Sequence, residues 1–361
     1  MRNWIFRPLL FLLIIIITFY VSLFVGSRYA LILMIGIFLG LSFEGFGFGF
    51  SGAWRSMIKE RNPNGIFSHL LSIGIASLFI IPLLHFNDQS LRGGVAPIGF
   101  SMIFGSFIFG VGMQIVKGCG SGILVNAGSG NIYALAALPF FSIGSFLGAY
   151  HISWWNNFNF SNPLLLDGWL GLATTLVLLL LTYFLIRYFS SPKYFKFPKK
   201  YIFFSIILAM LATFHIVVSG QPLGIVYGLG LWISKLAVGS GIDLSNSVFF
   251  KNEINAIRIK ESIFTDITSL TSIGIIIGSI SVGLWRKNTL NEVVSSSWMS
   301  ILVIVISAFL MGYSARLAFG CNIGAFFSGI SSGSIHGWLW FVSAFFGSYL
   351  GIKFRPYCGF K

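Results

Sequence analysis

Charged residues are scarce in this chain. Only 9% of its 361 residues are Asp, Glu, Lys or Arg, whereas 56% are hydrophobic and the mean hydropathy is +0.88. A water-soluble fold could not cover so much apolar surface, so this composition excludes a soluble globular protein. The sequence instead predicts an all-α polytopic membrane protein.

Cysteine and acidic residues are also rare, with three cysteines and nine Asp and Glu residues. An odd number of cysteines without a CxxC pair argues against a disulfide framework and a structural zinc site. The acidic and histidine residues are too scattered for a carboxylate pair, a catalytic triad or a metal cage. No P-loop is present. We therefore expect no metal, no cofactor, no direct use of ATP and no soluble-enzyme chemistry.

Long apolar segments are abundant. About 20 residues span a hydrocarbon core of roughly 30 Å, and several candidates are rich in glycine and end in polar stretches that suit half-helices. We therefore expect nine to eleven true spans, the first of them an anchor because it is too long for a secretory signal. The eleven candidates cover residues 8–27, 30–50, 65–86, 96–116, 131–153, 167–190, 201–219, 221–240, 262–284, 298–318 and 333–352.

Positive charge is in excess, at a formal +14. No basic helix with interleaved aromatics is present to bind nucleic acid, so we assign this charge to cytoplasmic loops and anionic lipid of the inner membrane. Loop 187–200 is basic and predicts the cytoplasmic face, whereas the Trp-rich segment 151–167 lacks Lys and Arg and predicts the outer face. Four basic residues of the second half cannot all be cytoplasmic in a simple eleven-span count, which indicates that some segments re-enter. They are Arg286, Lys287, Lys353 and Arg355.

Two glycine- and cysteine-containing segments resemble each other, KGCGSGILVNAGSGN at 117–131 and FGCNIGAFFSGISSGS at 319–334. When Cys119 is aligned with Cys321, the later GSFLGA and GSYLGI stretches match after one inserted residue. Repeats of this kind are typical of secondary transporters, whose ligand site lies near the midplane between the halves. We therefore predict two pseudo-symmetric, inverted repeats, 1–165 and 201–361, joined by a linking span and basic loop at 166–200.

The Gly-Cys segments are the predicted site. Non-helical backbone at membrane depth is tolerated only where it is buried in protein or lines a polar cavity. We therefore expect each segment to fold inward as a loop followed by a short helix, so that the two meet at a central waist. Free amides at a helix N-terminus favour an anion, and the thiols favour a soft sulfur atom. A small sulfur-containing anion fits this setting better than a sugar or a metal cation.

Charged residues near the two segments are further candidates, because a charge within a span usually faces a cavity or a partner. Lys117 and Arg316 would draw the anion in, although either could instead snorkel to the membrane surface. Glu44 is a candidate for the same reason, or it pairs with Arg55. The other candidates within the two segments are Gly118, Gly120, Gly122, Gly320, Asn322 and Gly324.

The motifs resemble those of a known family. GCGSGILVNAGSGN is similar to the GCTSG…GEGN motif of the YeeE/YedE sulfur-transport family, and GCNIGAFFSGISSGSIHGW with the following GSYLGIKFRP is similar to its second motif. The resemblance is sharp over 110–150 and 310–359. It implies inward loops that nearly meet in a narrow waist, and cysteines that pass thiosulfate along by thiol hydrogen bonds. That role would fall to Cys119 and Cys321.

This sequence departs from the family pattern at two places. A third cysteine is expected in the segment 45–55, which has Phe48, Phe50 and Ser51 instead, and the acidic residue of GEGN is Ser129 here. Thiosulfate and related sulfur or selenium species therefore stay open as substrates. Cys358 does not replace the missing cysteine by position, and we interpret it as a packing residue rather than a transport residue. Lesser candidates are Asn126, Asn131, Ser328 and His336, and Asp243 is a candidate loop cap.

These observations predict a membrane transporter or channel for a small sulfur-containing anion. Weak S–H donors would meet its sulfur, while amides and cations would hold its oxygens. One alternative is a membrane sulfurtransferase or redox enzyme, in which a cysteine thiolate attacks an S–S bond and becomes a persulfide. Others are a transporter of a selenium compound and a structural subunit. The expected partners are the anion, the lipid bilayer and a soluble sulfur-carrier protein.

Overall fold

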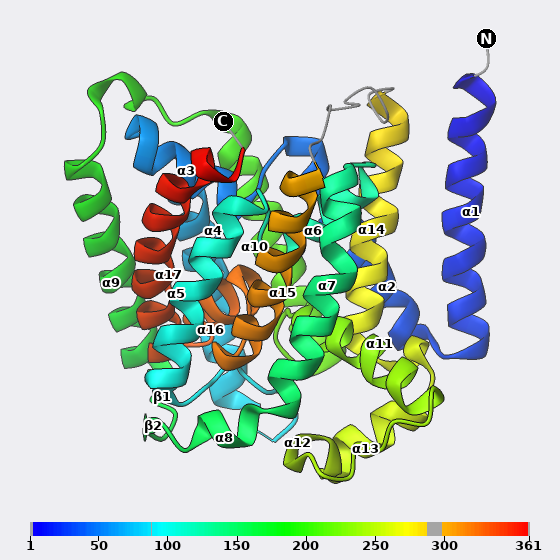
Figure 1. Cartoon of the computed structure of the whole chain (residues 1–361). Coiled ribbons are helices and arrows are strands. Elements are labelled where there is room, and N and C mark those ends of the chain that lie inside the picture. Colours follow the sequence, from blue (N-terminus) through cyan, green and yellow to red (C-terminus); the bar gives the residue numbers. More distant parts are fainter. Residues whose placement is uncertain (1–2, 88, 287–297, 360–361) are drawn as a thin grey trace.

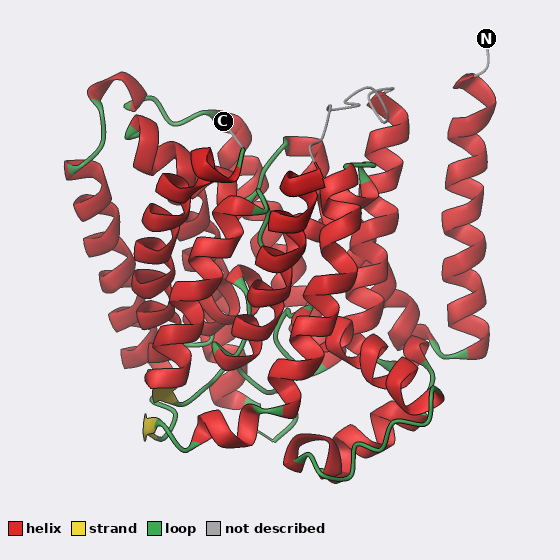
Figure 2. Cartoon of the chain, viewed as in Figure 1, coloured by secondary structure: helices red, strands yellow, loops and turns green. Residues whose placement is uncertain are grey.

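The computed structural model describes residues 3–87, 89–286 and 298–359, and these ranges are almost entirely helical, as Figure 2 shows. The described strands, β1 (Ile98–Gly99) and β2 (Asn159–Ser161), pair antiparallel. The long helices, labelled in Figure 1, are α1 (Asn3–Phe24), α2 (Ser27–Phe46), α4 (Asn64–Phe86), α5 (Phe100–Ile115), α7 (Ile132–Tyr150), α9 (Gly168–Tyr188), α10 (Lys199–Ser219), α11 (Val226–Gly239), α14 (Ile267–Arg286), α15 (Trp298–Leu317) and α17 (Ile335–Phe354). The short helices are α3 (Phe50–Glu60), α6 (Gly120–Gly128), α8 (Ile152–Asn156), α12 (Val248–Lys251), α13 (Glu253–Lys260), the π-helix η3 (Asn322–Phe327) and α16 (Ser328–Ser331), with 3-10 turns η1 (Pro192–Tyr194), η2 (Ile263–Thr265) and η4 (Arg355–Cys358).

Each of the eleven predicted apolar segments forms one long helix. Nine helical segments of the described chain are long and apolar enough to cross a membrane. The other two predicted segments form α1 and α11, whose apolar parts, Leu10–Phe24 and Val226–Gly239, are shorter. Large apolar side chains such as Leu170 and Phe184 of α9 are exposed on the outside of the bundle, where lipid is the matching solvent. The prediction of an all-α, multi-pass membrane protein is confirmed.

Glycines allow three pairs of helices to pack with their backbones in contact: α5 with α17, α7 with α15, and α2 with α14. A Cβ atom at Gly110 or Gly347 would collide with the backbone of the facing helix in the first pair, and one at Gly144 or Gly312 would do so in the second. Small residues at such interfaces let membrane helices gain close van der Waals contact, since lipid provides no hydrophobic drive for their association. These glycines therefore hold the bundle together.

The helix pairs cross between the two predicted repeats. Helix α5 leads into Cys119 and α7 follows it, whereas α15 leads into Cys321 and α17 follows it. Since α5 packs on α17 and α15 packs on α7, each helix that leads into one cysteine lies against the helix that follows the other. In the same reciprocal way, α4 contacts α16 and α14 contacts α6. This exchange encloses both Gly-Cys segments within the bundle.

The basic ends of several helices lie on one face. In Figure 1 the upper ends of α3, α14 and α17 lie on the same side as loop 187–200, and α8, α12 and α13 lie on the opposite side. A backbone hydrogen bond supports this placement of α3 and the basic loop. Ser191 N–H in the loop donates over 3.0 Å to the carbonyl of Arg61, which directly follows α3. Arg286, Lys353 and Arg355 therefore share a face with the basic loop, while Lys287 lies outside the described residues. A simple count of eleven spans could not place these basic residues on one face. The reason is that α11 has 14 residues and stays near the side of α12 and α13.

A polar segment after α11, for which the sequence predicted no helix, forms the short helices α12 and α13. Lys235 of α11 holds the end of α13, since its Nζ donates to the carbonyls of Arg258 and Ile259, both over 2.7 Å. A cation at a helix C-terminus satisfies carbonyls that have no partner within the helix. This short hairpin covers part of one face of the bundle, next to the pocket described below.

The glycine contacts generate a stability prediction. In Gly144→Ala the new methyl group meets the backbone of Phe309 and Tyr313, which cannot move without separating α7 from α15. We expect a loss of about 1–3 kcal/mol in the free energy of unfolding, measured as a lower melting temperature of the detergent-solubilised protein. Gly45→Ala is the matched control, because no atom lies within 4 Å of a Cβ at that helical glycine. Equal melting temperatures for the two variants would contradict the packing role.

Candidate functional site

The two Gly-Cys segments turn out of their helices in the same way. Helix α5 ends at Ile115 and α15 at Leu317, and two residues later the chain takes left-handed backbone at Lys117 (φ 62°) and Phe319 (φ 58°). Among the described non-glycine residues, Arg61 is the one other with positive φ. Such backbone costs free energy at a non-glycine residue and persists where surrounding structure demands it. The same rare turn at aligned positions is therefore a local likeness between the two segments.

Each cysteine stands at the start of a short helix, as expected. Cys119 (φ −79°, ψ −173°) precedes α6, and Cys321 (φ −94°, ψ −168°) precedes η3 and α16. The amides at these starts are not all free, however. Gly122 N–H donates to Cys119 Sγ over 3.4 Å, and Ser121 Oγ lies 3.2 Å from the same sulfur. The first cysteine thus caps its own helix, so the Gly122 amide is used within the segment.

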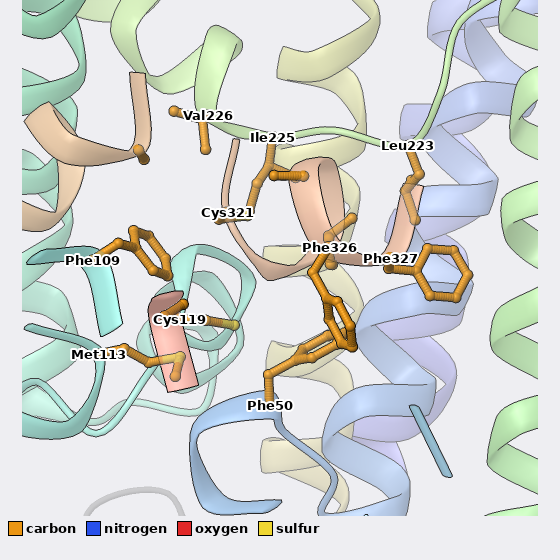
Figure 3. Packing of buried hydrophobic residues seen from close by; sticks show 14 of the residues in the cluster. Phe50, Phe109, Met113, Cys119, Leu223, Ile225, Val226, Cys321, Phe326 and Phe327 are labelled. Atoms are coloured by element: carbon orange, nitrogen blue, oxygen red, sulfur yellow. The ribbon is translucent and has the colours of Figure 1, made fainter. Parts of the chain in front are cut away.

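The two segments meet at Cys321 and Gly120. Cys321 Sγ lies 3.1 Å from the position that a Cβ on Gly120 would take, and the Ile225 side chain lies 3.3 Å from that position. Both cysteines are free thiols and are 1% and 0% exposed. Figure 3 shows them in one packed cluster with Ile225, Phe326 and Phe50. The predicted neighbourhood of the two thiol segments is therefore present, and apolar side chains form its walls.

A pocket of about 360 Å³ opens beside the second segment. Gly320 and Gly324 form one wall, and Arg316 and Tyr227 form another. The volume far exceeds the roughly 30 Å³ of one water molecule, so a small anion fits. A Cβ on Gly324 would have no atom within 4 Å, because this glycine borders the open space.

Arg316 is the cation of this pocket. Its Nε–H donates to the Ser145 carbonyl over 3.3 Å and to Ser145 Oγ over 3.1 Å. Its guanidinium carbon lies 5.1 Å from the Tyr227 ring centre and 5.3 Å from that of Phe249, distances typical of cation–π contacts. Within the described residues, no carboxylate lies within salt-bridge distance of Arg316. The guanidinium therefore keeps its positive charge available to an anion.

Near the first Gly-Cys segment an arginine comes from a different helix. When Cys119 is aligned with Cys321, Gln114 stands at the position of Arg316, and its amide is bound by Arg55 of α3. Arg55 Nε–H donates to Gln114 Oε1 over 3.2 Å, and Gln114 Nε2 donates to the Ser51 carbonyl over 3.2 Å. The sequence offered Arg55 as a partner for Glu44 rather than for Gln114, since nothing local indicates a partner 59 residues away. Lys117, beside Cys119, is exposed.

Three of the predicted residues have structural partners. Glu44 lies 4.0 Å from Arg286, an ion pair between Oε1 and Nη1, so the expected pairing with Arg55 is wrong. Asn131 caps α7 by accepting from Tyr133 and Ala134 N–H over 3.0 and 3.1 Å. Ser328 Oγ donates to the Leu223 carbonyl over 2.8 Å.

The remaining predicted residues lie as follows. His336 is buried with Nδ1 2.7 Å from Ser334 Oγ. The Asn126 carbonyl accepts from Asn131 N–H over 2.9 Å. Gly118 packs against the Gly122 backbone, 3.2 Å from where a Cβ would lie. Cys358 is half-buried in the turn after α17 and packs against the hydrophobic cluster that contains Cys119 and Cys321.

Asp243 lies outside the membrane-spanning segments and caps its loop. Its carboxylate accepts from Ser245 Oγ–H over 2.6 Å and Ser245 N–H over 2.8 Å. These two hydrogen bonds hold the pKa of the carboxyl below its ordinary value, and the bond from the Ser245 hydroxyl has the larger effect. Asp243 therefore stabilises the loop that connects α11 to α12. In the described part of the chain, no group of three His, Cys, Asp or Glu side chains gathers as metal ligands.

The burial of the cysteines generates a labelling prediction. Native protein in mild detergent should take up one adduct of a polyethylene-glycol maleimide, at half-buried Cys358, because Cys119 and Cys321 are enclosed. After unfolding in sodium dodecyl sulfate, three adducts should form, as counted by gel shift. Cys358→Ser should abolish the native adduct. Native labelling of two or three cysteines would show that the thiol pair is open to bulky reagents.

The chain is also similar to known proteins. A family model described as "Sulphur transport" matches residues 47–350, which is most of the chain and includes both Gly-Cys segments. The chain is 25% identical to the thiosulfate transporter TsuA of Spirochaeta thermophila over 340 residues, covering 87% of this chain and 94% of that protein.

Two shorter matches point the same way. The probable transporter YedE of Escherichia coli is 28% identical over 149 residues, and this match covers 41% of the chain but 36% of YedE. The chain thus spans about a third of the length of that relative. The E. coli TsuA is 27% identical over 106 residues, covering 29% of this chain and 30% of that protein. By the family match over residues 47–350, with both thiol-bearing segments inside it, this chain belongs to the sulphur transport family.

Proposed function

We propose that this protein moves a small sulfur-containing anion, thiosulfate or a similar sulfur or selenium species, across the membrane. The observation that carries the proposal is the contact of Cys321 with Gly120, beside Cys119 and next to the pocket lined by Arg316. The names of the relatives, a thiosulfate transporter and a probable transporter, support it. In this proposal, residues 1–165 and 201–361 are inverted repeats whose re-entrant loops form the waist, and 166–200 joins them.

The anion enters through the pocket of Arg316. A guanidinium without a carboxylate partner attracts anions, and its planar N–H groups suit the oxygens of an oxyanion. Ser145 and the rings of Tyr227 and Phe249 fix its position. The pocket lies beside α12 and α13, on the face predicted to be outside by the positive-inside argument. From there the glycine wall of the second segment leads to Cys321.

At the waist, weak donors replace the arginine. A thiol S–H is a weak donor and sulfur a weak acceptor, so the thiols of Cys321 and Cys119 can contact the soft sulfur end of the anion without holding it firmly. Ile225 and Phe326 exclude water there because both are buried. A permeation site must release what it binds, and neutral thiols in an apolar wall meet that requirement better than cations would.

Beyond Cys119 the anion meets the second cationic region. Arg55, held by Gln114, and the exposed Lys117 lie near the first segment. The arrangement of one arginine for each Gly-Cys segment gives an attractive region on both sides of a neutral constriction. A soluble sulfur-carrier protein that receives the anion on the cytoplasmic face is the partner that this route would supply.

Uptake of radiolabelled thiosulfate by cells that lack other sulfur sources tests the proposal. We expect Cys119→Ala and Cys321→Ala each to reduce uptake by up to about tenfold, because each removes a contact of the constriction worth up to about 1.5 kcal/mol. Cys358→Ser is the matched control and should transport at the wild-type rate. Wild-type uptake in both alanine variants would refute the thiol pathway.

The same thiols distinguish a transporter from a sulfurtransferase. Mass spectrometry of purified protein after exposure to thiosulfate should show unmodified Cys119 and Cys321 if they act as transient donors. A stable gain of one sulfur atom on either cysteine, without uptake, would identify a persulfide-forming enzyme in which the S–S bond breaks and sulfite leaves.

A bulky residue at Gly324 tests the entry pocket. Gly324→Leu places a side chain in open space rather than against another atom, so the fold should keep its melting temperature while uptake falls about tenfold or more. Gly45→Leu is the control, since that glycine is equally free of neighbours but lies away from the pocket. Full uptake by Gly324→Leu at normal expression would show that the anion takes another route.

A further inference from the structure

Four buried polar side chains around Phe326 have polar atoms without a hydrogen-bond partner. They are Trp54, His69, Asn322 and Trp340, each 0% exposed. Both indole Nε1 atoms, both imidazole nitrogens of His69 and both amide atoms of Asn322 are unpaired. These make six of the thirteen such atoms in the described chain. Buried polar groups are nearly always paired in native proteins, so such a concentration indicates a ligand site.

Three of the four residues meet at one ring, that of Phe326. The Phe326 ring centre lies 5.9 Å from that of Trp54, 6.4 Å from that of Trp340 and 6.3 Å from that of His69. Asn322 stands four residues before Phe326 in the same π-helix, on the same face. Short π-helical stretches are frequent at functional sites. Figure 3 shows Phe326 beside Phe50 in the cluster that contains both cysteines.

His69 illustrates why packing alone is an insufficient explanation. Its imidazole stacks on Phe50, with ring centres 4.3 Å apart and an interplanar angle of 12°, and Phe48 contacts it edge-on. A phenylalanine would fill this aromatic site without leaving two nitrogens unpaired. His215, by contrast, is equally buried but fully used, since its nitrogens lie 3.1 Å from Thr271 Oγ1 and 3.3 Å from the Gln221 carbonyl.

We propose that Asn322 and His69, with the indole N–H groups of Trp54 and Trp340, form an oxyanion subsite directly beside Cys321. This rests on the proposed function and deepens it, because it assigns the two ends of the substrate. The oxygens accept from the four neutral side chains, and the sulfur contacts the thiol and the aromatic rings, which tolerate sulfur well. The Asn322 carbonyl oxygen needs a donor, which a water accompanying the anion supplies.

The subsite predicts selectivity against sulfate. Sulfate has a fourth oxygen where thiosulfate has its outer sulfur, and that oxygen would face rings and a weak S–H donor after losing its hydration. Polar groups buried without good partners are costly, so a site built in this way rejects such an analogue. Neutral donors also bind the oxygens less firmly than arginines do, which favours release.

Shape-preserving apolar variants test the subsite. Asn322→Leu and His69→Phe should keep or raise the melting temperature, because unpaired buried polar atoms are removed. Uptake of radiolabelled thiosulfate should fall about tenfold in each, as oxyanion contacts are lost. His215→Phe is the matched control. It should lower the melting temperature, since Thr271 and Gln221 lose their partner, and leave uptake per folded molecule unchanged.

The outcomes separate this inference from the function on which it rests. Absence of thiosulfate uptake by the wild-type protein would overturn the proposed function and the subsite together. Wild-type uptake that Cys321→Ala abolishes, while Asn322→Leu and His69→Phe leave it intact, would overturn the subsite alone. A parallel loss of stability and uptake in both variants, as expected of ordinary core residues, would also overturn it.

Discussion

The contact between Cys321 and Gly120 constrains the rest of the molecule. Two non-helical turns lie inside the bundle, and their backbone amides tolerate neither lipid nor a wide separation. With Cys321 Sγ 3.1 Å from where a Cβ at Gly120 would lie, a side chain at that glycine would require its neighbours to shift by a few tenths of an ångström. The left-handed turns at Lys117 and Phe319 aim the chain at this point. The lengths of the helices, the glycine contacts between paired helices and the order of the two halves are all consistent with this close approach of the two segments.

The exchange of helices between the halves makes that approach rigid. A loop held only by its own two helices could move with them, but each Gly-Cys segment is flanked by a helix that packs on the opposite half. Separating the segments would therefore require α5 to leave α17 and α15 to leave α7 together. In those pairs, the backbones of the two helices are in direct contact at Gly110 and Gly312. Rearrangement of side chains can therefore absorb little of such a motion.

Much of this structure could be predicted from the sequence because its causes are local. Apolar length places all eleven long helices, and the rarity of cysteine identifies the paired segments. The contacts of Arg55 with Gln114 and of Arg286 with Glu44 join residues 59 and 242 positions apart, and no local pattern encodes them. His69 was missed for a different reason. A lone histidine in an apolar helix is expected to find a hydrogen-bond partner, and only the packed structure shows that it has none.

The two halves differ in residues but keep one arrangement of charge. Arg316 stands in the second half where the first half has Gln114, so an alignment alone suggests that one side lacks its cation. The structure fills that place from α3, because the Gln114 amide accepts from Arg55. An arginine therefore lies near each Gly-Cys segment, and the proposed route runs between the two arginines past the buried thiols. A fixed charge within the waist would have to be desolvated and would hold an anion too firmly to release it, so cations at the edges and weak donors between them form the physically consistent arrangement for passage.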